Sequence, residues 1–328
     1  MADLRKDPTR GRWVLVRPRT IGVSSSDQCP FCPGHESLTP PEIVAYRKDG
    51  SPPDGPGWSV RVIPEADPYF RIEQKLVREG VGLYDHLSPR GATELIVESP
   101  AHDDTAATLG EAQWEQVLWM YAERIRDLKR DVRIRDILVT RRHRVPGARI
   151  LHPYSRLTAI PIIFDDVRRK LRECREYYEY KRRCVYCDII RQEIAGAERI
   201  IRLTERFVVM SPYAPQSPFE VWIVPRQHHC AYEDALTASS VPELAALLSR
   251  YFRTLAGPLG DPSFEMTLYT APNVAAKVLP DEWATIAEDY HWHLEVVPSQ
   301  PRARIGGIYV NEIAPEEAAS RLRDTWNT

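Results

Sequence analysis

The chain has 328 residues, of which 43% are apolar and 27% charged, as in ordinary globular proteins. Its formal net charge of -2 provides no overall basic field for nucleic acid, and no apolar run approaches the roughly 18 residues of a membrane helix. The N-terminal segment MADLRKDPTRGRW lacks the apolar core of a secretory signal. We therefore expect a cytoplasmic protein with no nucleic-acid or membrane partner.

The first half of the chain alternates short segments rich in Val and Ile with one long amphipathic segment. Helical spacing of apolar residues from Trp114 to Leu128 predicts a helix over about 110–130. A more polar helix is expected over 165–182, as a connector. The predicted strands are 12–18, 42–47, 58–64, 93–99, 136–142 and 156–164.

The second half repeats this plan. Each half begins with a C-x-x-C pair, and the first cysteines of the two pairs, Cys29 and Cys184, are 155 residues apart. The pattern indicates an internal duplication of an α+β unit, with an antiparallel sheet flanked by helices in each half. We predict domains at 1–180 and 181–328. The second half is expected to contain strands at 206–212, 219–225, 264–271 and 290–298, and helices at 240–256 and 315–324.

Four of the six cysteines form the pairs Cys29/Cys32 and Cys184/Cys187. In a reducing compartment such pairs are more often metal sites than disulfides. Zinc takes four Cys or His ligands in a closed structural site. The alternative is that the cysteines are reduced and structural, and that the histidines are satisfied by hydrogen bonds.

The candidate partners of the first pair are His35, His102, His143 and His152. His35 is too close in sequence to be the usual partner, whereas His102 follows a strand at a chain reversal and His152 opens one. We therefore predict zinc at Cys29, Cys32, His102 and His152. By the same logic the second set is Cys184, Cys187, His228 and His291, so the chain would bind one or two Zn²⁺ ions.

Stretches spread over nearly the whole chain carry a family resemblance. They are LRKDPTRGRWVLVRP, CPFCPGHE, ELIVESPAH, HPYS, CVYCDIIRQE, FEVWIVPRQH, YHWHLEVVP and GGIYVNEIAPEEAA. In these segments the chain resembles galactose-1-phosphate uridylyltransferase and its nucleotidyl-transferring relatives in the histidine-triad superfamily. The resemblance implies two similar halves, a homodimer, and zinc at the positions grouped above.

The resemblance also implies a reaction. In the family a His attacks the α-phosphorus of a UDP-sugar, holds the nucleotide covalently and passes it to a sugar 1-phosphate. The family's active strand reads His-Pro-His, then a small residue and Gln, but here it reads HPYSR. Tyr154 therefore stands in the place of the nucleophile and Arg156 in that of the Gln. A phenol with a pKa of about 10 is mostly neutral at about pH 7 and is a poor nucleophile unless activated.

Other departures surround the same position. The preceding loop keeps Gly147 but has Arg149 where the family has a phosphate-contacting Ser, and Arg17 follows the first strand. Guanidinium groups suit phosphate, although these arginines could instead face solvent. The predicted phosphate contacts are Gly147, Arg149, Ser155, Arg156 and Arg17.

In the second half, Tyr269 and, on a looser alignment, Lys170 stand where some family members have His and Glu ligands of another metal. His293 occupies the position equivalent to the nucleophile, although that half is not the catalytic one in the family. Tyr154 and His293 are the candidate catalytic residues.

Three functions remain open. The first is a diverged enzyme that acts on a nucleotide sugar, a sugar phosphate or a related phosphoester by nucleotidyl transfer, phosphoryl transfer or hydrolysis. The second is a non-catalytic protein that binds a ligand or a partner on the same scaffold. The third, an intact uridylyltransferase that tolerates Tyr154, is the least favoured, because the changes lie at the chemical centre.

Overall fold

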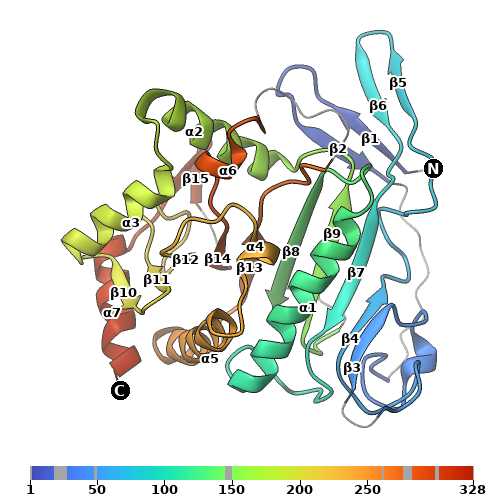
Figure 1. The fold of residues 1–328 in the computed structure, drawn as a ribbon, viewed down its shortest axis with the longest axis horizontal. Helices are drawn as coiled ribbons and strands as arrows, with labels where there is room; N and C mark the ends of the chain where they lie inside the picture. Colours follow the sequence, from blue (N-terminus) through green and yellow to red (C-terminus); the bar gives the residue numbers. More distant parts are fainter. Residues whose placement is uncertain are drawn as a thin grey trace.

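The computed structural model describes residues 2–17, 28–47, 50–144, 150–260, 262–275, 283–299 and 303–327. Its centre is a ten-stranded antiparallel sheet in the order β10-β11-β12-β14-β13-β8-β9-β7-β4-β3 (Figure 1). The first half contributes β3 (Val44–Arg47), β4 (Trp58–Pro64), β7 (Ala92–Val97), β8 (Asp136–His143) and β9 (Tyr154–Ile160). The second half contributes β10 (Ile200–Leu203), β11 (Phe207–Met210), β12 (Val221–Pro225), β13 (Phe264–Tyr269) and β14 (His293–Pro298).

The strand order displays the duplication. Read inward from either edge, the order is first strand, second, third, fifth and fourth of a half, and the two fourth strands, β8 and β13, pair at the middle. This arrangement confirms an α+β fold built from two similar halves. The halves are continuous through one sheet, because Phe264 pairs with His143 and Leu268 with Val139. A domain boundary at 180/181 stays a prediction.

One face of the sheet is covered by α1 (Glu111–Lys129) and α5 (Ser240–Leu259), which lie side by side (Figure 1). The apolar stripe of α1 is fully buried at Trp114, Val117 and Tyr121, as its helical spacing predicts. The main hydrophobic core joins these helices to inward-facing residues of both halves. The duplicated units therefore share a single core on this face.

The opposite face is covered unequally. In the second half, α2 (Asp165–Lys181), α3 (Val185–Gly196) and α6 (Ile286–Asp289) pack over it through apolar side chains such as Leu171, Tyr186 and Tyr290. In the first half, the described segments on this face are the loop that carries Cys29 and Phe31 and, at the end of β9, the second sheet. Among the described residues, the face of the first half is therefore the more open of the two around the start of β9.

The remaining elements lie at the edges. A second sheet has the order β2-β1-β6-β5 and packs through Leu4 and Leu87 against Ile160 at the end of β9. The helix α7 packs on α5 and β10. The bounds are β1 (Asp3–Lys6), β2 (Trp13–Val16), η1 (Glu36–Leu38), β5 (Arg78–Val81), β6 (Tyr84–Leu87), α4 (Tyr232–Ala235), β15 (Ala303–Ile305), β16 (Ile308–Val310) and α7 (Pro315–Asn327).

The expected long helices and the strands of the large sheet are confirmed, with ends that differ by a few residues. The features that were missed include the strand β1, the β5–β6 and β15–β16 hairpins, the short strand β10, the helix α3 directly after Cys184, and the short helices α4 and α6. The hairpin strand β5 reads REGV and is exposed throughout, so it lacks the alternation that marks a half-buried strand. None of the helices in the described ranges combines the length and hydropathy needed to cross a bilayer.

Candidate metal centres and the adjoining strand face

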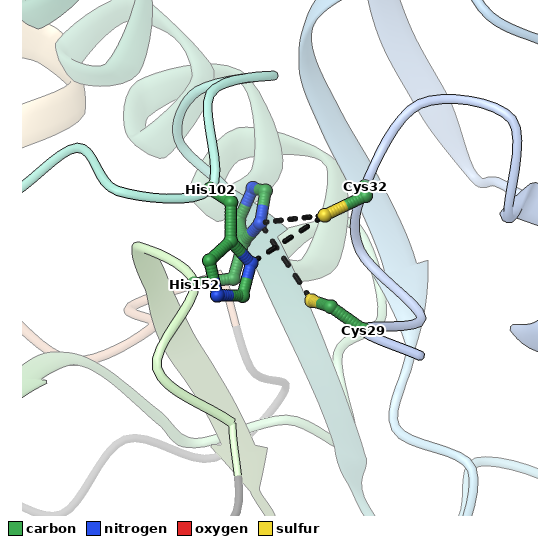
Figure 2. A group of neighbouring side chains, drawn as sticks. All are labelled: Cys29, Cys32, His102 and His152. Carbon is green, nitrogen blue, oxygen red and sulfur yellow. Dashed lines mark hydrogen bonds between the residues drawn. The ribbon is translucent and has the colours of Figure 1, made fainter. Parts of the chain in front are cut away.

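The four predicted ligands of the first half meet at one point (Figure 2). Cys29 and Cys32 come from the loop before β3, His102 follows β7, and His152 precedes β9. Their ligand atoms all lie within 4.8 Å of one another. The Sγ of Cys32 is 3.4 Å from Nδ1 of His102 and 3.8 Å from Nδ1 of His152, and the Sγ of Cys29 is 3.8 Å from that same nitrogen.

These separations fit a tetrahedral zinc ion. Bonds of about 2.3 Å to sulfur and about 2.05 Å to nitrogen place the two donor atoms about 3.6 Å apart at the tetrahedral angle. The Nε2 of His152 lies 2.7 Å from the backbone oxygen of Ser99. Because this oxygen only accepts, the proton belongs on Nε2, which leaves the lone pair of Nδ1 directed at the thiols. The donor set and the tautomer therefore both suit Zn²⁺.

The second half repeats this geometry with Cys184, Cys187, His228 and His291. Cys187 is 3.4 Å from His228 and 3.7 Å from His291, and Cys184 is 3.9 Å from His291. The Nε2 atoms of His228 and His291 bond to backbone oxygens of Ala287 and Pro225, at 2.8 and 3.0 Å. The two clusters thus agree in donor types, pairing and outer hydrogen bonds.

Ionisation of the thiols also favours a cation at each cluster. Burial, and then the thiol of Cys29, raise the pKa of Cys32 to about 11. A hydrogen bond shared with Cys187, and then burial, raise the pKa of Cys184 well above its usual range. Two neighbouring thiols cannot both ionise unaided in such surroundings, whereas a divalent ion stabilises both thiolates.

The two histidines that were set aside lie outside the first cluster. His35 directs Nδ1 to the backbone oxygen of Cys29 at 2.8 Å and so braces the loop. His143, at the end of β8, stacks on Phe264 with ring centroids 5.3 Å apart.

Tyr154 is the first residue of β9 and lies on the more open face of the sheet. Its ring meets that of Phe31 edge to face, with centroids 5.5 Å apart. Phe31 stands between the two cysteines in sequence and also contacts the ring of His152, at 6.0 Å. Tyr154 is half-buried and packs in a small apolar cluster with Leu95 and Val97. The phenol is therefore positioned by the same loop that carries the thiols.

Ser155 points the other way. Its side chain is fully buried toward α1, and its Oγ donates to Oε1 of Glu98 and also bonds to the hydroxyl of Tyr121. Neighbouring residues of a strand face opposite sides of the sheet, so Ser155 cannot share a ligand surface with Tyr154. A phosphate contact from the Ser155 side chain, expected from its place in the motif, does not fit this position.

Arg156 lies on the same face as Tyr154 but is already paired. Its Nη2 is 2.6 Å from Oε1 of Glu65, and the two side chains are 31% and 17% exposed. The carboxylate cancels most of the guanidinium's charge at short range. A phosphate would therefore meet a neutral ion pair here, and it would bind to Arg156 only if Glu65 moved aside.

The other predicted phosphate contacts are not assembled around Tyr154 in the described structure. Arg17 pairs with Asp67 and lies over the ring of Tyr69, at 5.2 Å. Gly147 and Arg149 lie outside the described residues.

In the second half, His293 takes the strand position that corresponds to Tyr154. Its side chain is fully buried, stacked on Tyr269 at 5.0 Å and inclined to Tyr186 at 4.7 Å. Burial, and then the charge of Lys170, lower the pKa of His293, although a hydrogen bond to Glu295 opposes them. The residue is shut inside the protein, so it is not placed to reach a ligand at Tyr154.

Lys170 reaches into this closed cluster from α2. Its Nζ is 2.5 Å from Oε1 of Glu295 and 4.5 Å from the centre of the Tyr269 ring. Burial works against ionisation of Glu295, but His293 and Lys170 hold its pKa at about 2. A lysine ammonium cannot ligate a metal, and the pair is internally neutral. This site therefore fastens α2 to the sheet.

Two residues of consequence escaped the sequence analysis. Glu295 is the partner of Lys170, and its position two residues after His293 in an alternating strand was an available signal. Glu98 accepts hydrogen bonds from Tyr121, Ser155 and Arg141 in the core beneath Tyr154. No local pattern marked Glu98, because its partners lie far away in sequence.

Comparisons with known proteins agree with the fold. No family model matches the chain. ADP-glucose phosphorylase of Arabidopsis thaliana is 27% identical over 343 residues, covering 98% of this chain and 92% of the relative. Galactose-1-phosphate uridylyltransferase of Thermotoga maritima is 26% identical over 349 residues, covering 99% of both.

Solved structures give the same answer. A uridylyltransferase structure superposes with a TM-score of 0.82 at 25% identity, over 99% of this chain and 98% of the other. An Arabidopsis thaliana ADP-glucose phosphorylase with bound ADP-glucose superposes with a TM-score of 0.75 at 26% identity, over 99% of both chains. The likeness in sequence and fold to galactose-1-phosphate uridylyltransferases and to an ADP-glucose phosphorylase therefore spans the whole chain.

Proposed function

We propose that this protein is a nucleotide-sugar enzyme that transfers a nucleoside monophosphate to a phosphate-bearing acceptor, with the reaction centred on the face of β9 that carries Tyr154. Homology over the whole chain to uridylyltransferases and to an ADP-glucose phosphorylase supports this class of reaction. The observation that carries the proposal is the position of Tyr154. It is half-buried, two residues beyond His152 and against Phe31, where the family has its nucleophile.

The two Cys–His clusters would each hold one Zn²⁺, with all four positions taken by protein. Such closed sites are structural, since none is left for water or substrate. The first would tie the Cys29–Cys32 loop to the starts of β9 and of the segment after β7. The metal would make this loop rigid, and the loop would then hold Phe31 against the ring of Tyr154.

The proposed reaction has two displacements at the α-phosphorus. The phenol oxygen of Tyr154 forms a bond to this phosphorus while the bond to the sugar-phosphate oxygen breaks, and the sugar 1-phosphate leaves. The phenol proton passes to solvent or to the leaving oxygen. A phosphate oxygen of the acceptor then attacks the phosphorus, and the phenol is released. With inorganic phosphate as acceptor, the products are a nucleoside diphosphate and a sugar 1-phosphate.

A second candidate is binding without turnover. Two observations favour it: the chain has a phenol where the family uses an imidazole, and the adjoining Arg156 is neutralised by Glu65. In that case the open face of the first half would hold a nucleotide sugar as a ligand.

The test uses the purified full-length protein with ADP-glucose or UDP-glucose, each with and without inorganic phosphate. Release of the nucleoside diphosphate, and a protein adduct one nucleoside monophosphate heavier in its mass spectrum, are the expected results. Tyr154→Phe removes only the hydroxyl and should abolish the adduct, while Tyr84→Phe, on the exposed hairpin, should not. Binding by calorimetry without turnover would instead support the ligand-binding protein.

Tyr154→His separates a diverged enzyme from a standard one. If this variant transfers UMP to galactose 1-phosphate and the wild-type protein does not, the tyrosine defines a different reaction or none. Ordinary UMP transfer by the wild-type protein would contradict our interpretation of the substitution. Turnover by Tyr154→Phe at the wild-type rate would exclude the phenol as nucleophile.

Assembly and location also belong to the proposal. The family resemblance supports a homodimer, and six cysteines without disulfides suit a reducing cytoplasm. Light scattering of the purified protein tests the first expectation, and fractionation of the native cells tests the second.

A further inference from the structure

A buried polar network lies directly beneath Tyr154, on the side of the sheet that faces α1. Glu98, just beyond the end of β7, accepts from the hydroxyl of Tyr121 at 2.9 Å and from Oγ of Ser155 with one carboxylate oxygen. Its other oxygen accepts from Nε of Arg141 at 2.6 Å. Glu98 and Ser155 are completely inaccessible, and Arg141 is 2% exposed. A full ion pair is thus sealed inside the core.

Glu98 holds the backbone on both sides of Tyr154. Its backbone N–H donates to the oxygen of Pro153 at 3.1 Å, and its carboxylate receives the hydroxyl of Ser155. Its own backbone oxygen accepts from Gln113 of α1 at 2.6 Å. Glu98 therefore binds both residues that flank Tyr154: Pro153 through its backbone and Ser155 through its carboxylate. The helix α1 in turn holds Glu98 in place.

The fold does not require such a network. Strand register identifies the counterparts in the second half. Leu294 corresponds to Ser155, because the two residues pair with equivalent positions on the neighbouring strands. Leu268 corresponds to Arg141, because Leu268 pairs with Leu294 as Arg141 pairs with Ser155. Both leucines are buried in the main core. At these two positions the same sheet geometry is thus built from apolar side chains.

Burying a carboxylate and a guanidinium costs several kcal/mol for each group, and an apolar replacement of both is often neutral or stabilising. Stability therefore does not account for the pair. The difference between the halves lies on the other face of the strand. His293 is enclosed, whereas Tyr154 is partly open.

We infer that Glu98, supported by Arg141, is a positioning residue that fixes the backbone of Pro153–Arg156 and so presents Tyr154 in one orientation. The inference rests on the proposed function for its purpose, because it assigns the network to the site at Tyr154. It also makes a physical claim that holds without turnover: loss of the network loosens Tyr154 before it destabilises the fold.

The test compares two double variants of the full-length protein labelled with fluorotyrosine. Glu98→Met with Arg141→Met replaces the network by apolar side chains. Glu94→Met with Arg124→Met is the matched control, since that pair is also a buried ion pair on the α1 side of the sheet, with bonds of 2.8 Å, but does not touch Pro153–Arg156. The Tyr154 resonance is assigned from Tyr154→Phe, and unfolding and metal content are measured for all variants.

In the first variant we expect the Tyr154 resonance to broaden or split, and amide exchange at 154–156 to rise about tenfold, with metal content retained. Turnover of ADP-glucose with phosphate should fall in kcat with little change in KM. The control should leave the resonance and kcat unchanged. An unaltered Tyr154 resonance in the first variant, or equal effects in both, would overturn the inference.

Two further arms keep the result decisive. If Glu98→Met with Arg141→Met does not fold, Ser155→Ala removes only the bond nearest Tyr154, and the same change in its resonance is expected. If the wild-type protein neither binds nor converts ADP-glucose, the proposed function fails. The resonance and amide exchange then still decide whether Glu98 positions Tyr154.

Discussion

Each half of this protein contains a Cys–His cluster suited to a metal ion, but the halves differ on the strand that follows the cluster. His152 and His291 open equivalent strands with nearly identical Cys–His distances. Beyond them, the first half has Tyr154 on a partly open face, and the second has His293 in a closed aromatic cluster. Duplicated units can therefore keep a cluster whose four donor atoms must lie at fixed distances, while the adjoining surface diverges.

Ion pairs show the same contrast. At equivalent strand positions, Arg156 pairs with Glu65 near the surface, and Glu295 pairs with Lys170 beneath α2. The first pair leaves the face accessible, while the second closes it by fastening a helix. In the second half, the charged residues at this position therefore serve to pack a helix on the sheet.

The largest effects are expected at the metal clusters. Cys32→Ala and Cys187→Ala should each lower bound zinc by one ion per chain. Each should also reduce the free energy of unfolding by at least about 3 kcal/mol, because the free energy of binding a structural zinc ion stabilises the folded state. Elemental analysis and thermal unfolding measure both quantities. Only Cys32→Ala should also weaken binding of ADP-glucose.

The control is Cys230→Ala, at a cysteine outside both clusters. Unchanged zinc in either ligand variant would show that the clusters do not bind the metal. Equal loss of nucleotide-sugar binding in both would remove the functional difference between the halves.

Next in size is the closed ion pair of the second half. Lys170→Met leaves Glu295 buried with only His293 as a partner, and it should cost about 2–4 kcal/mol in denaturant unfolding. Lys170→Met with Glu295→Met should recover most of this loss, because no unpaired charge remains. If the double variant were less stable than the single one, the pair would not be the cause.

The open ion pair of the first half should matter less for stability. Arg156→Met breaks the pair with Glu65, whose members are 31% and 17% exposed, and should cost at most about 1 kcal/mol. Measured beside Lys170→Met under the same conditions, it gives the energetic difference between the two faces. A cost as large as that of Lys170→Met would mean that this face is as closed as the other.

A further effect depends on pH. Burial, and then the charge of Glu295, raise the pKa of Glu220 to about 7, whereas the unfolded chain ionises near its ordinary value. Between about pH 4.5 and 7 the folded state therefore holds a proton that the unfolded state has lost, so stability falls as pH rises, by up to about 1.4 kcal/mol per pH unit.

Glu220→Gln should remove this slope, and the free energy of unfolding of the wild-type protein relative to the variant should decline across that window. The exposed carboxylate variant Glu265→Gln serves as the control. A difference that stays constant with pH, or grows in the opposite direction, would contradict burial as the cause.

Much of the fold was predictable because the pattern is local. Helical spacing in α1 and β-branched runs in β4 and β12 each identify an element without reference to distant residues. The hairpin β5–β6 was missed because its strands are short and exposed, and α3 because it begins directly after a presumed ligand. The hairpin lacks the hydrophobic period on which prediction depends, whereas α3 has apolar residues at helical spacing, Tyr186, Ile190 and Ile194, that were overlooked.

The site was predictable only in part. The metal sets could be grouped from residue type and from their places at strand ends, since few side chains bind zinc and four must converge. The charge on the face of β9 that carries Tyr154 could not be predicted. Glu65 lies 91 residues before Arg156, and nothing near either residue indicates that the two meet.

The sequence by itself indicated the family resemblance, the duplication, the two Cys–His sets and the tyrosine at position 154, because each is written in residue types at recognisable spacings. Only the tertiary structure decided that Ser155 turns into the core, that Glu65 neutralises Arg156, and that Lys170 pairs with Glu295 beside the buried His293. The reason is physical: ligation depends on which atoms a residue has, whereas charge and access depend on which distant residues the sheet brings beside it.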